Sequence, residues 1–187
     1  SFPTGGAGFG SGSNPLGSQG SLILSADNRL LFAVNAGSDS ITAFAVAGDA
    51  LRPLQTISSG GTQPVSLTVH RDMLYVLNAG GASPNIAGFR IVPEAQQSKT
   101  LVPIVGSTQP LPNGTTATPA EISFSRDGSA ILVTEPGANQ IVSFAVSQSG
   151  QVSLVNTFAV MGSGPFGLAF SQNSFALTAN PTLTTGL

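Results

Sequence analysis

The sequence predicts an all-β fold, and three observations support that prediction. Short apolar stretches alternate with turn-forming residues along the chain, as expected for strands joined by tight connections. The 187 residues include 23 Gly and 13 Pro, so turns are frequent. Charged residues make up only 7% of the chain, whereas solvent-exposed helices usually carry many Lys and Glu on their outer faces. Many short strands therefore fit this composition better than helices do.

A repeat of about 45 residues organises the expected strands. The first strand of each unit is short and apolar and ends at Ser25, His70, Ser125 and Ser171, which are 45, 55 and 46 residues apart. The second strand ends at Asn35, Asn78, Glu135 and Asn180, which are 43, 57 and 45 residues apart. The ends of the first strands and the ends of the second strands thus recur at nearly the same intervals. A Pro-rich insertion at about 107–119 accounts for the longer middle interval.

Each unit contains further strands. Second strands are expected at 30–35, 73–78, 130–135 and 175–180, third strands at 41–46, 86–91 and 141–146, and fourth strands at 51–57, 101–105 and 152–160. Four antiparallel strands per unit are typical of a β-propeller blade. One such sheet has two apolar faces, and stacking blades around an axis buries both. The sequence therefore predicts a β-propeller with about three and a half blades.

The repeat also divides the chain. Residues 1–16 are expected to end a preceding blade and form a loop, followed by blades at 17–63, 64–118 and 119–164 and an incomplete blade at 165–187. The three prolines Pro64, Pro119 and Pro165 each stand three residues before an inner-strand residue, namely Leu67, Ile122 and Leu168. Proline is tolerated there because the strand ladder does not need its missing N–H. In the first unit, Gln19 occupies this place.

Ring closure admits more than one arrangement, since propellers usually need four to eight blades. The chain could form part of a larger ring. Alternatively, Ser1–Gly6, which resembles Thr56–Gly61, could supply the outer strand of the last blade, with 182–187 as its third strand. A second copy of the chain could also complete the ring. We favour the larger ring, because residues 181–184 match the third-strand pattern poorly.

Composition and charge exclude several function classes. The net charge is −2 and Lys99 is the only lysine, so the chain has little to neutralise a nucleic-acid backbone. No apolar run is long enough to span a membrane, and there is no cysteine. The glycine-rich stretch 5–10 opens no helical pattern, so we interpret it as a loop rather than a phosphate-binding motif. The sequence predicts no cofactor and no metal site.

The composition also bears on location. Few lysines with abundant Ser, Thr and Gly favour an extracellular or periplasmic protein and leave the cytoplasm open. The triplet Asn113–Thr115 makes Asn113 a candidate glycosylation site if the protein enters a secretory pathway. Chance occurrence of the triplet is the simpler interpretation.

Two carboxylates are candidate catalytic residues. Glu121 begins an inner strand, in register with Ser21, Ser66 and Gly167, and a carboxylate beside a narrow channel can act as an acid or base with a raised pKa. Glu135 replaces the asparagines that end the other second strands. The competing interpretations are an ordinary polar lining residue for Glu121 and turn support for Glu135. Asparagine commonly supports turns by bonding its own backbone.

His70, Arg71 and Arg126 are candidate substrate-binding residues. His70 is the only histidine, and arginines at 71, 90 and 126 could bind an anion through paired hydrogen bonds. The competing interpretation is that His70 is a polar turn residue and that the arginines are solvated surface charges.

The amino-acid sequence of the repeat resembles the repeats of one known family. Residues 32–37 with 40–44, 74–80 with 86–89, and 124–128 with 133–135 are similar to the repeats of lactonase-like propellers, which include 6-phosphogluconolactonase and carboxymuconate-cyclising enzymes. Members usually have seven blades, which implies that this chain holds about half a ring. The characterised enzymes use His, Arg and Glu around the central channel. No family His motif matches here, so no catalytic residue is carried over.

The resemblance implies a function. The chain would belong to an enzyme that hydrolyses or forms a small anionic lactone or sugar acid at the central channel, using carboxylates for acid–base chemistry and arginine for the anion. The alternative is a secreted, non-catalytic propeller that acts as a binding or scaffold module. The scarcity of ionisable residues near the inner strands favours this alternative.

Overall fold

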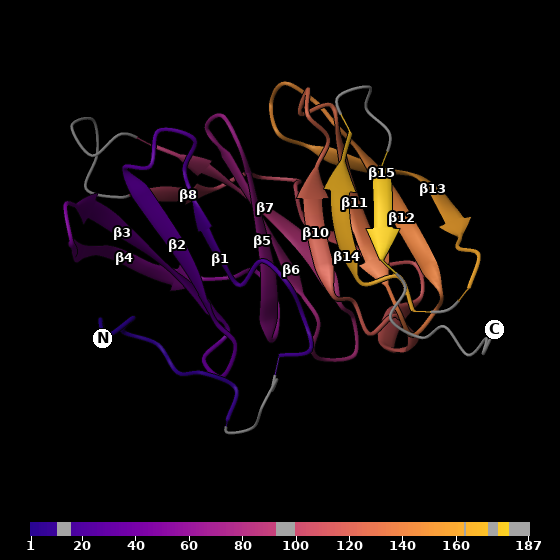
Figure 1. The fold of residues 1–187 in the computed structure, drawn as a ribbon, viewed down its shortest axis with the longest axis horizontal. Helices are drawn as coiled ribbons and strands as arrows, with labels where there is room; N and C mark the ends of the chain where they lie inside the picture. Colours follow the sequence, from indigo (N-terminus) through magenta and orange to yellow (C-terminus); the bar gives the residue numbers. More distant parts are fainter. Residues whose placement is uncertain (11–15, 93–99, 163, 172–175, 180–187) are drawn as a thin grey trace.

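The chain folds into a series of antiparallel sheets (Figure 1). The computed structural model describes residues 1–10, 16–92, 100–162, 164–171 and 176–179. The first sheet contains β1 (Leu22–Leu24), β2 (Leu30–Asn35), β3 (Ser40–Ala47) and β4 (Ala50–Ser58), in that spatial order. The second contains β5 (Pro64–His70), β6 (Met73–Asn78), β7 (Asn85–Ile91) and β8 (Leu101–Pro103), with β9 (Gln109–Pro110) also paired to β7.

The remaining sheets follow the same plan. The third contains β10 (Glu121–Phe124), β11 (Ala130–Glu135), β12 (Gln140–Val146) and β13 (Val152–Ala159), and a single 3₁₀ turn, η1 (Gly114–Thr116), precedes it. The fourth sheet is described by β14 (Gly167–Phe170) and β15 (Ala176–Ala179). Residues 180–187, expected to continue this blade, lie outside the described residues. The all-β, four-stranded prediction is confirmed.

The sheets stack with their first strands innermost. Figure 1 shows β1, β5, β10 and β14 side by side, and contacts join each of them to the next. One apolar core lies between the first and second sheets, where Phe32 and Ile41 meet Leu74 and Phe89. A second core lies between the second and third sheets and includes Tyr75, Ile131 and Phe144 among its members.

Strand β6 shows why the repeat pattern leads to stacking. Its residues alternate between the two faces of the sheet, so Leu74 and Val76 join the first core while Tyr75 and Leu77 join the second. Every residue of β6 is buried. An antiparallel strand with one solvated face would instead alternate between buried and exposed positions.

The outer part of the second sheet differs from the prediction. A continuous fourth strand was expected at 101–105, but β8 ends at Pro103. The Gly88 carbonyl still accepts the Ile104 N–H at 2.9 Å, but the Gly88 N–H donates to the Ser107 hydroxyl at 2.9 Å, so this hydroxyl takes the place of a backbone carbonyl. Strand β9 resumes pairing with β7 at Asn85 and Ile86. The start of the expected 107–119 insertion therefore belongs to the sheet.

The N-terminal segment packs on the first sheet. The Thr4 carbonyl accepts hydrogen bonds from the Thr42 and Thr56 hydroxyls at 2.7 and 3.2 Å. Gly6 lies so close to Asn35 that an added side chain would collide with it, as would one at Gly61 with Asn78. Residues 1–6 thus contact the first blade as residues 56–61 contact the second, and their assignment to a preceding repeat unit stays a prediction. The alternative that residues 1–6 close a four-bladed ring stays a prediction, because its third strand, expected at 182–187, lies outside the described residues.

Candidate functional site

A row of hydrogen bonds joins the inner strands of neighbouring blades. The backbone N–H groups of Leu67, Ile122 and Leu168 occupy equivalent positions on β5, β10 and β14. Each donates to the preceding blade: Leu67 to the Gly20 carbonyl at 2.8 Å, Ile122 to the Ser66 hydroxyl at 3.2 Å, and Leu168 to Glu121 Oε2 at 2.8 Å. A second bond runs from the Phe124 N–H to the Thr68 hydroxyl at 3.0 Å. Successive blades thus satisfy one another's free inner-edge donors.

Glu121 combines this structural contact with a chemically usable carboxylate. It is half-buried, and burial raises the pKa of its carboxyl, while the Leu168 N–H acts in the opposite direction. Thr134 lies opposite in the register, and its hydroxyl accepts from the Glu121 N–H at 3.1 Å and donates to the Phe166 carbonyl at 2.9 Å. Glu121 Oε1 has no hydrogen-bond partner among the described residues and is not fully buried. One oxygen is therefore held while the other remains accessible.

Glu135 lies on the opposite face of the same sheet. Glu121 pairs with Thr134, and the next residue of β11 points the other way. Glu135 is fully buried, and burial raises the pKa of its carboxyl. Its Oε2 accepts a hydrogen bond from Asn113 Nδ2, and Oε1 has no partner among the described residues. The two carboxylates therefore do not converge on one reacting atom.

Asn113 links the η1 connection to this buried group. Its Nδ2 donates to Gln140 Oε1 at 2.9 Å as well as to Glu135. A glycan attached at Nδ2 would replace one of the two hydrogens that these contacts use, so glycosylation at Asn113 stays a prediction that this geometry does not favour.

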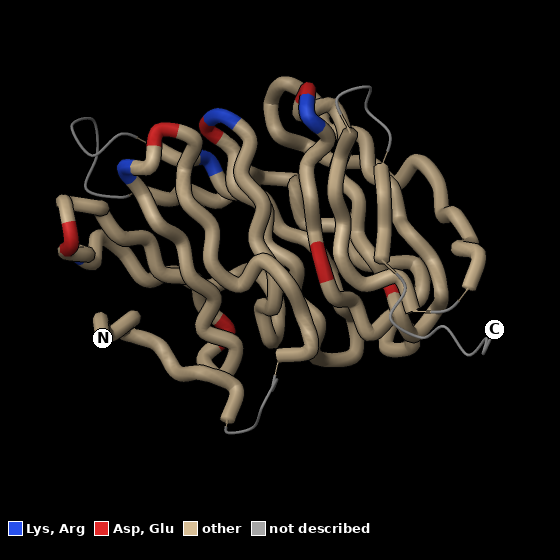
Figure 2. Tube along the Cα trace, in the orientation of Figure 1, with Lys and Arg blue, Asp and Glu red and all other residues tan. Residues whose placement is uncertain are grey.

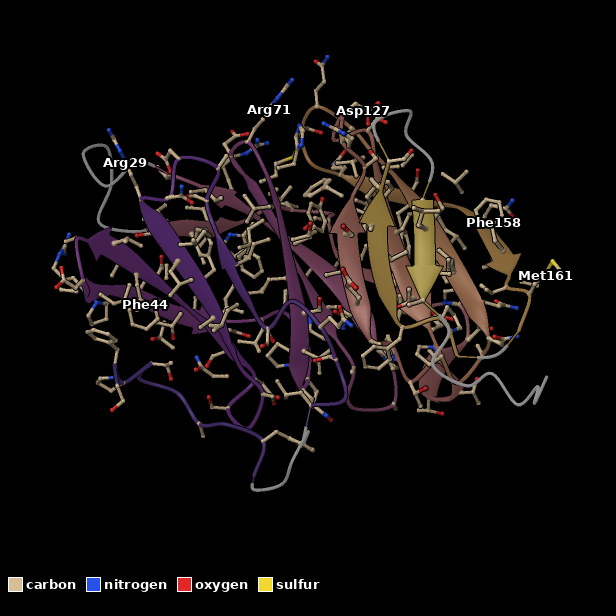
Figure 3. The ribbon with its side chains drawn as sticks, in the orientation of Figure 1. Arg29, Phe44, Arg71, Asp127, Phe158 and Met161 are labelled. Carbon is tan, nitrogen blue, oxygen red and sulfur yellow. The ribbon has the colours of Figure 1, made fainter. Side chains whose placement is uncertain are left out.

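The basic candidates lie at the far ends of the inner strands. Figure 2 shows the charged residues gathered mainly along one edge of the molecule, and Figure 3 places Arg29, Arg71 and Asp127 there. Arg71 and Arg126 are exposed in turns that follow β5 and β10. Strand β10 runs from Glu121 to Phe124, a length of roughly 13 Å, so it separates Glu121 from Arg126. The structure does not bring the arginines and the carboxylates into one site.

His70 packs between blades. It is the last residue of β5, and its ring lies 5.6 Å from the Phe124 ring. A side chain at Gly128 would collide with the imidazole, and Nε2 has no hydrogen-bond partner among the described residues. His70 therefore ends an inner strand beside a turn, as the competing interpretation expects, with its ring packed against the next blade, and it is remote from Glu121.

Two expectations about polar side chains are corrected. Asn35 and Asn78 do not support turns through their own backbone: Asn35 donates to the Thr42 hydroxyl at 2.9 Å, and Asn78 donates to Asn85 Oδ1 at 2.9 Å. Arg90 is not simply solvated, because it forms an ion pair with Asp72 at 2.8 Å and donates to the Ser149 carbonyl at 3.0 Å.

A segment that sequence reasoning did not assign to the site crosses the inner strands. We call residues 16–20 the crossing segment. The Ser18 hydroxyl donates to the Val65 carbonyl at 2.9 Å, and the Gln19 N–H donates to the Ala120 carbonyl at 3.0 Å. The Gln19 side-chain amide lies against Gly167, where an added Cβ would come within 3.2 Å of both amide heavy atoms. One feature of the sequence could have indicated this contact: Gln19 replaces a proline of the repeat and so retains a backbone N–H.

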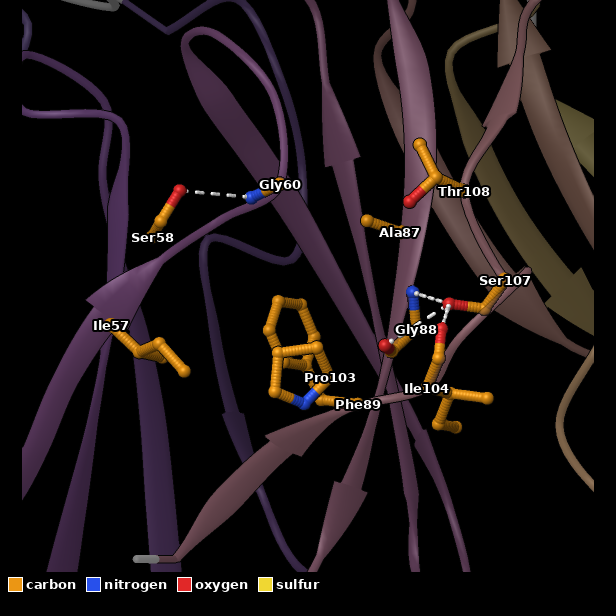
Figure 4. A pocket seen from close by; sticks show the side chains of 10 residues that line it. All are labelled: Ile57, Ser58, Gly60, Ala87, Gly88, Phe89, Pro103, Ile104, Ser107 and Thr108. Carbon is orange, nitrogen blue, oxygen red and sulfur yellow. Dashed lines mark hydrogen bonds between the residues drawn. The ribbon is translucent and has the colours of Figure 1, made fainter.

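A pocket of about 190 Å³ lies elsewhere, between the outer parts of the first two blades (Figure 4). Its lining includes Ile57, Phe89, Pro103 and Ile104, and Ser107 closes one side through its bonds to Gly88. The pocket results from the interruption between β8 and β9. Neither candidate carboxylate lines it.

Metal ligands and membrane-spanning helices are both missing from the described residues. No three His, Cys, Asp or Glu side chains in that part of the chain gather closely enough to hold a metal ion. None of its helical segments has the length and apolar character needed to cross a membrane.

These sheets and their inner-edge contacts define the class of the protein: a β-propeller built from four-stranded blades. The family model described as "Lactonase, 7-bladed beta-propeller" matches residues 10–110 and 103–181. The chain therefore belongs to the seven-bladed lactonase family. No curated protein matches the chain.

Solved structures support the same fold. A proposed 6-phosphogluconolactonase from Bacteroides fragilis superposes with a TM-score of 0.68 at 24% identity, covering 85% of this chain and 49% of that protein. The periplasmic gluconolactonase of Pseudomonas aeruginosa gives 0.63 at 24% identity, covering 84% and 49%. Hydrazine synthase from Kuenenia stuttgartiensis gives 0.65 at 18% identity, covering 88% and 42%. The chain thus spans about half the length of the first two structures.

Proposed function

We propose that this chain contributes to a lactone hydrolase in which Glu121 acts as the general base at the inner edge of the blades. Membership of the lactonase family supports the reaction class. The observation that carries the residue assignment is the arrangement of Glu121, with Oε2 held by the Leu168 N–H and Oε1 accessible. A carboxyl whose pKa is raised towards neutrality is also a stronger base than an ordinary one.

The proposed reaction is addition of water to the lactone carbonyl. Glu121 Oε1 accepts a proton from water while the water oxygen bonds to the carbonyl carbon. The bond from that carbon to the ring oxygen then breaks, and the ring oxygen takes up the proton to become a hydroxyl. Water and lactone thus give one hydroxy acid, and the carboxylate is regenerated.

The anion-binding role expected for arginine receives no support from this arrangement. Arg71 and Arg126 lie beyond the other ends of their strands. We therefore propose a substrate that carries a lactone group and do not assign it an anionic substituent.

The test is hydrolysis of D-glucono-1,5-lactone by the purified protein, corrected for spontaneous opening. We expect Glu121→Gln to lower kcat about 100-fold or more. Asp49→Asn, at an exposed turn residue, is the matched control and should leave the rate unchanged. Equal rates for Glu121→Gln and the unaltered chain would refute the base assignment.

A second candidate is a non-catalytic binding module. It is favoured by one observation: among the described residues, neither His70 nor any arginine shares the inner edge with Glu121 to assist catalysis. Binding of the lactone without turnover would support this alternative.

Assembly and location are also proposals. We infer that further blades complete the ring, supplied by the rest of a longer polypeptide or by a second copy. An extracellular or periplasmic location is supported by the composition and by the periplasmic location of the Pseudomonas aeruginosa structural neighbour.

A further inference from the structure

The crossing segment is fixed at several points. Leu16 packs against the core between the second and third blades, and Ser18, Gln19 and Gly20 each make a hydrogen bond to one of those blades. The bond from the Gln19 N–H to Ala120 spans about a hundred residues of sequence. Proline, which occupies this place in the other units, has no N–H and could not make it. The backbone at Gln19 is therefore held rigidly across the inner edge.

This backbone position directs the Gln19 side chain to the start of β14. Its amide lies against Gly167, and the next residue, Leu168, donates its N–H to Glu121. Gly167 occupies the repeat position of Ser66 and Glu121, so the missing side chain leaves room for the amide. Gln19 and Glu121 thus approach adjacent residues of β14 from the two neighbouring chain segments.

The exposed amide and carboxylate have complementary hydrogen-bonding groups. The Gln19 side chain offers one acceptor oxygen and one donor nitrogen, and it has no hydrogen-bond partner among the described residues. Glu121 Oε1 adds a second acceptor. Neighbouring hydroxyl groups, each of which both donates and accepts, match this set. Arg71 and Arg126 are remote, so the pair suits uncharged hydroxyls better than a phosphate.

We propose that Gln19 is a substrate-binding residue that holds ligand hydroxyl groups beside Glu121. The proposal rests on the proposed function in placing the reacting group at Glu121. It adds the chemical class of the ligand: an uncharged, polyhydroxylated ring. Gln19 selects and positions this ligand, and Glu121 acts on it.

The test uses 1,5-anhydro-D-glucitol, an uncharged ring compound that cannot hydrolyse, titrated into the ¹⁵N-labelled protein and followed by NMR. We expect the Leu168 N–H and the Gln19 side-chain amide signals to shift together. Gln19→Ala keeps the backbone hydrogen bond to Ala120. It should raise the dissociation constant by about 5- to 10-fold, as expected for lost hydrogen bonds. Gln148→Ala, at an exposed turn, is the matched control and should bind as the unaltered chain does.

Each outcome decides the proposal. Absence of shifts, equal affinity of Gln19→Ala, or tighter binding of 6-phosphogluconate than of anhydroglucitol would overturn it. The melting temperature of Gln19→Ala shows whether lost affinity reflects a folding defect, and Gln19→Asn, which retains an amide, should recover part of the binding.

If Gln19→Ala binds normally while Glu121→Gln loses hydrolysis, this proposal fails and the proposed function stands. If Gln19→Ala loses binding while Glu121→Gln hydrolyses normally, Gln19 stands as a binding residue and the base assignment fails.

Discussion

Single polar side chains join the blades at their inner edges. Ser66 and Glu121 hold equivalent positions in successive repeats, and each accepts the N–H of the inner strand that follows. A hydroxyl and a carboxylate thus perform the same structural task. For Glu121 this task leaves one oxygen accessible, and the proposed role of Glu121 as a base depends on that oxygen.

Removing the Ser66 hydroxyl should destabilise the protein. Ser66→Ala leaves the Ile122 N–H without its acceptor in a fully buried seam, which should lower the free energy of unfolding by about 1–3 kcal/mol. Urea unfolding measures the change. Ser153→Ala, at an exposed position of β13, is the control and should have little effect. Equal losses for the two variants would contradict the role of the inter-blade bond.

The two carboxyls with raised pKa predict how stability depends on pH. A carboxyl whose pKa is higher in the folded than in the unfolded state binds more protons when folded. The stability that Glu121 and Glu135 contribute is therefore fully present below the ordinary value of 4.5 and is lost as pH rises through the raised pKa. Glu135→Gln should reduce this fall, because the amide keeps an acceptor for Asn113 and cannot ionise.

Urea unfolding at pH 4 and pH 8 tests this prediction. The loss of stability between the two pH values should be smaller in Glu135→Gln than in the unaltered protein. Asp49→Asn, which alters an exposed turn carboxyl, provides the comparison. A larger loss in the Gln variant would show that the buried carboxylate is stabilised in its charged form.

At the scale of the elements, the turn between first and second strands repeats one hydrogen-bond pattern. Ser25 and Ser125 each donate a hydroxyl to the aspartate two residues later, at 2.6 and 2.7 Å. The same hydroxyls accept the N–H of Leu30 and Ala130, so each serine closes its turn. In the second blade, Met73 pairs directly with His70, and the turn is shorter.

This turn makes a titration prediction. The Ser125 hydroxyl, with the Ser129 N–H and hydroxyl, lowers the pKa of Asp127 to about 2. Ser125→Ala should move that pKa up towards the ordinary value of 3.8, while the lowered pKa of Asp27 in the first blade stays where it was. An NMR titration of the aspartate carboxyl signals reports both groups in one sample. An unmoved Asp127 would mean that Ser129 alone holds the carboxylate.

The sequence predicted these elements better than it predicted the site. Strand alternation and turn residues are local, so β2, β3 and β12 lie close to where the pattern placed them. The interruption after β8 was missed because the bond between Ser107 and Gly88 replaces a backbone partner that the pattern alone cannot distinguish. The contacts of Gln19 and Glu121 were missed for a related reason. They join residues that lie many tens of positions apart, and only stacking of the blades brings them together.

At the scale of the whole molecule, the described residues leave part of the outward face of the first blade, along β1, uncovered. Leu22 and Leu24 are 61% and 46% exposed, whereas their repeat equivalents Leu67 and Phe124 are 2% and 7% exposed. In the third blade, Phe158 on the outer strand β13 is 50% exposed (Figure 3). Apolar faces of this kind mark interaction surfaces, which supports the proposal that further blades complete the ring.

Association should therefore depend on that face. We expect the 187-residue chain to associate in solution, and Leu22→Asp to shift it towards the monomer without a large change in melting temperature. Light scattering coupled to size-exclusion chromatography measures the mass. A discrete dimer would support closure by a second copy. A chain that stays monomeric at high concentration, with Leu22→Asp indistinguishable from it, would contradict an exposed docking face.

The three inner-edge seams use different acceptors: a backbone carbonyl at Gly20, a hydroxyl at Ser66 and a carboxylate at Glu121. Identical repeat units would make every seam alike. Here the neighbours are distinct, so each blade is matched to the one beside it. A recombinant in which two blades exchange places would keep every strand yet mismatch the seams. These inter-blade hydrogen bonds, as well as the connectivity of the chain, thus specify the order of the blades.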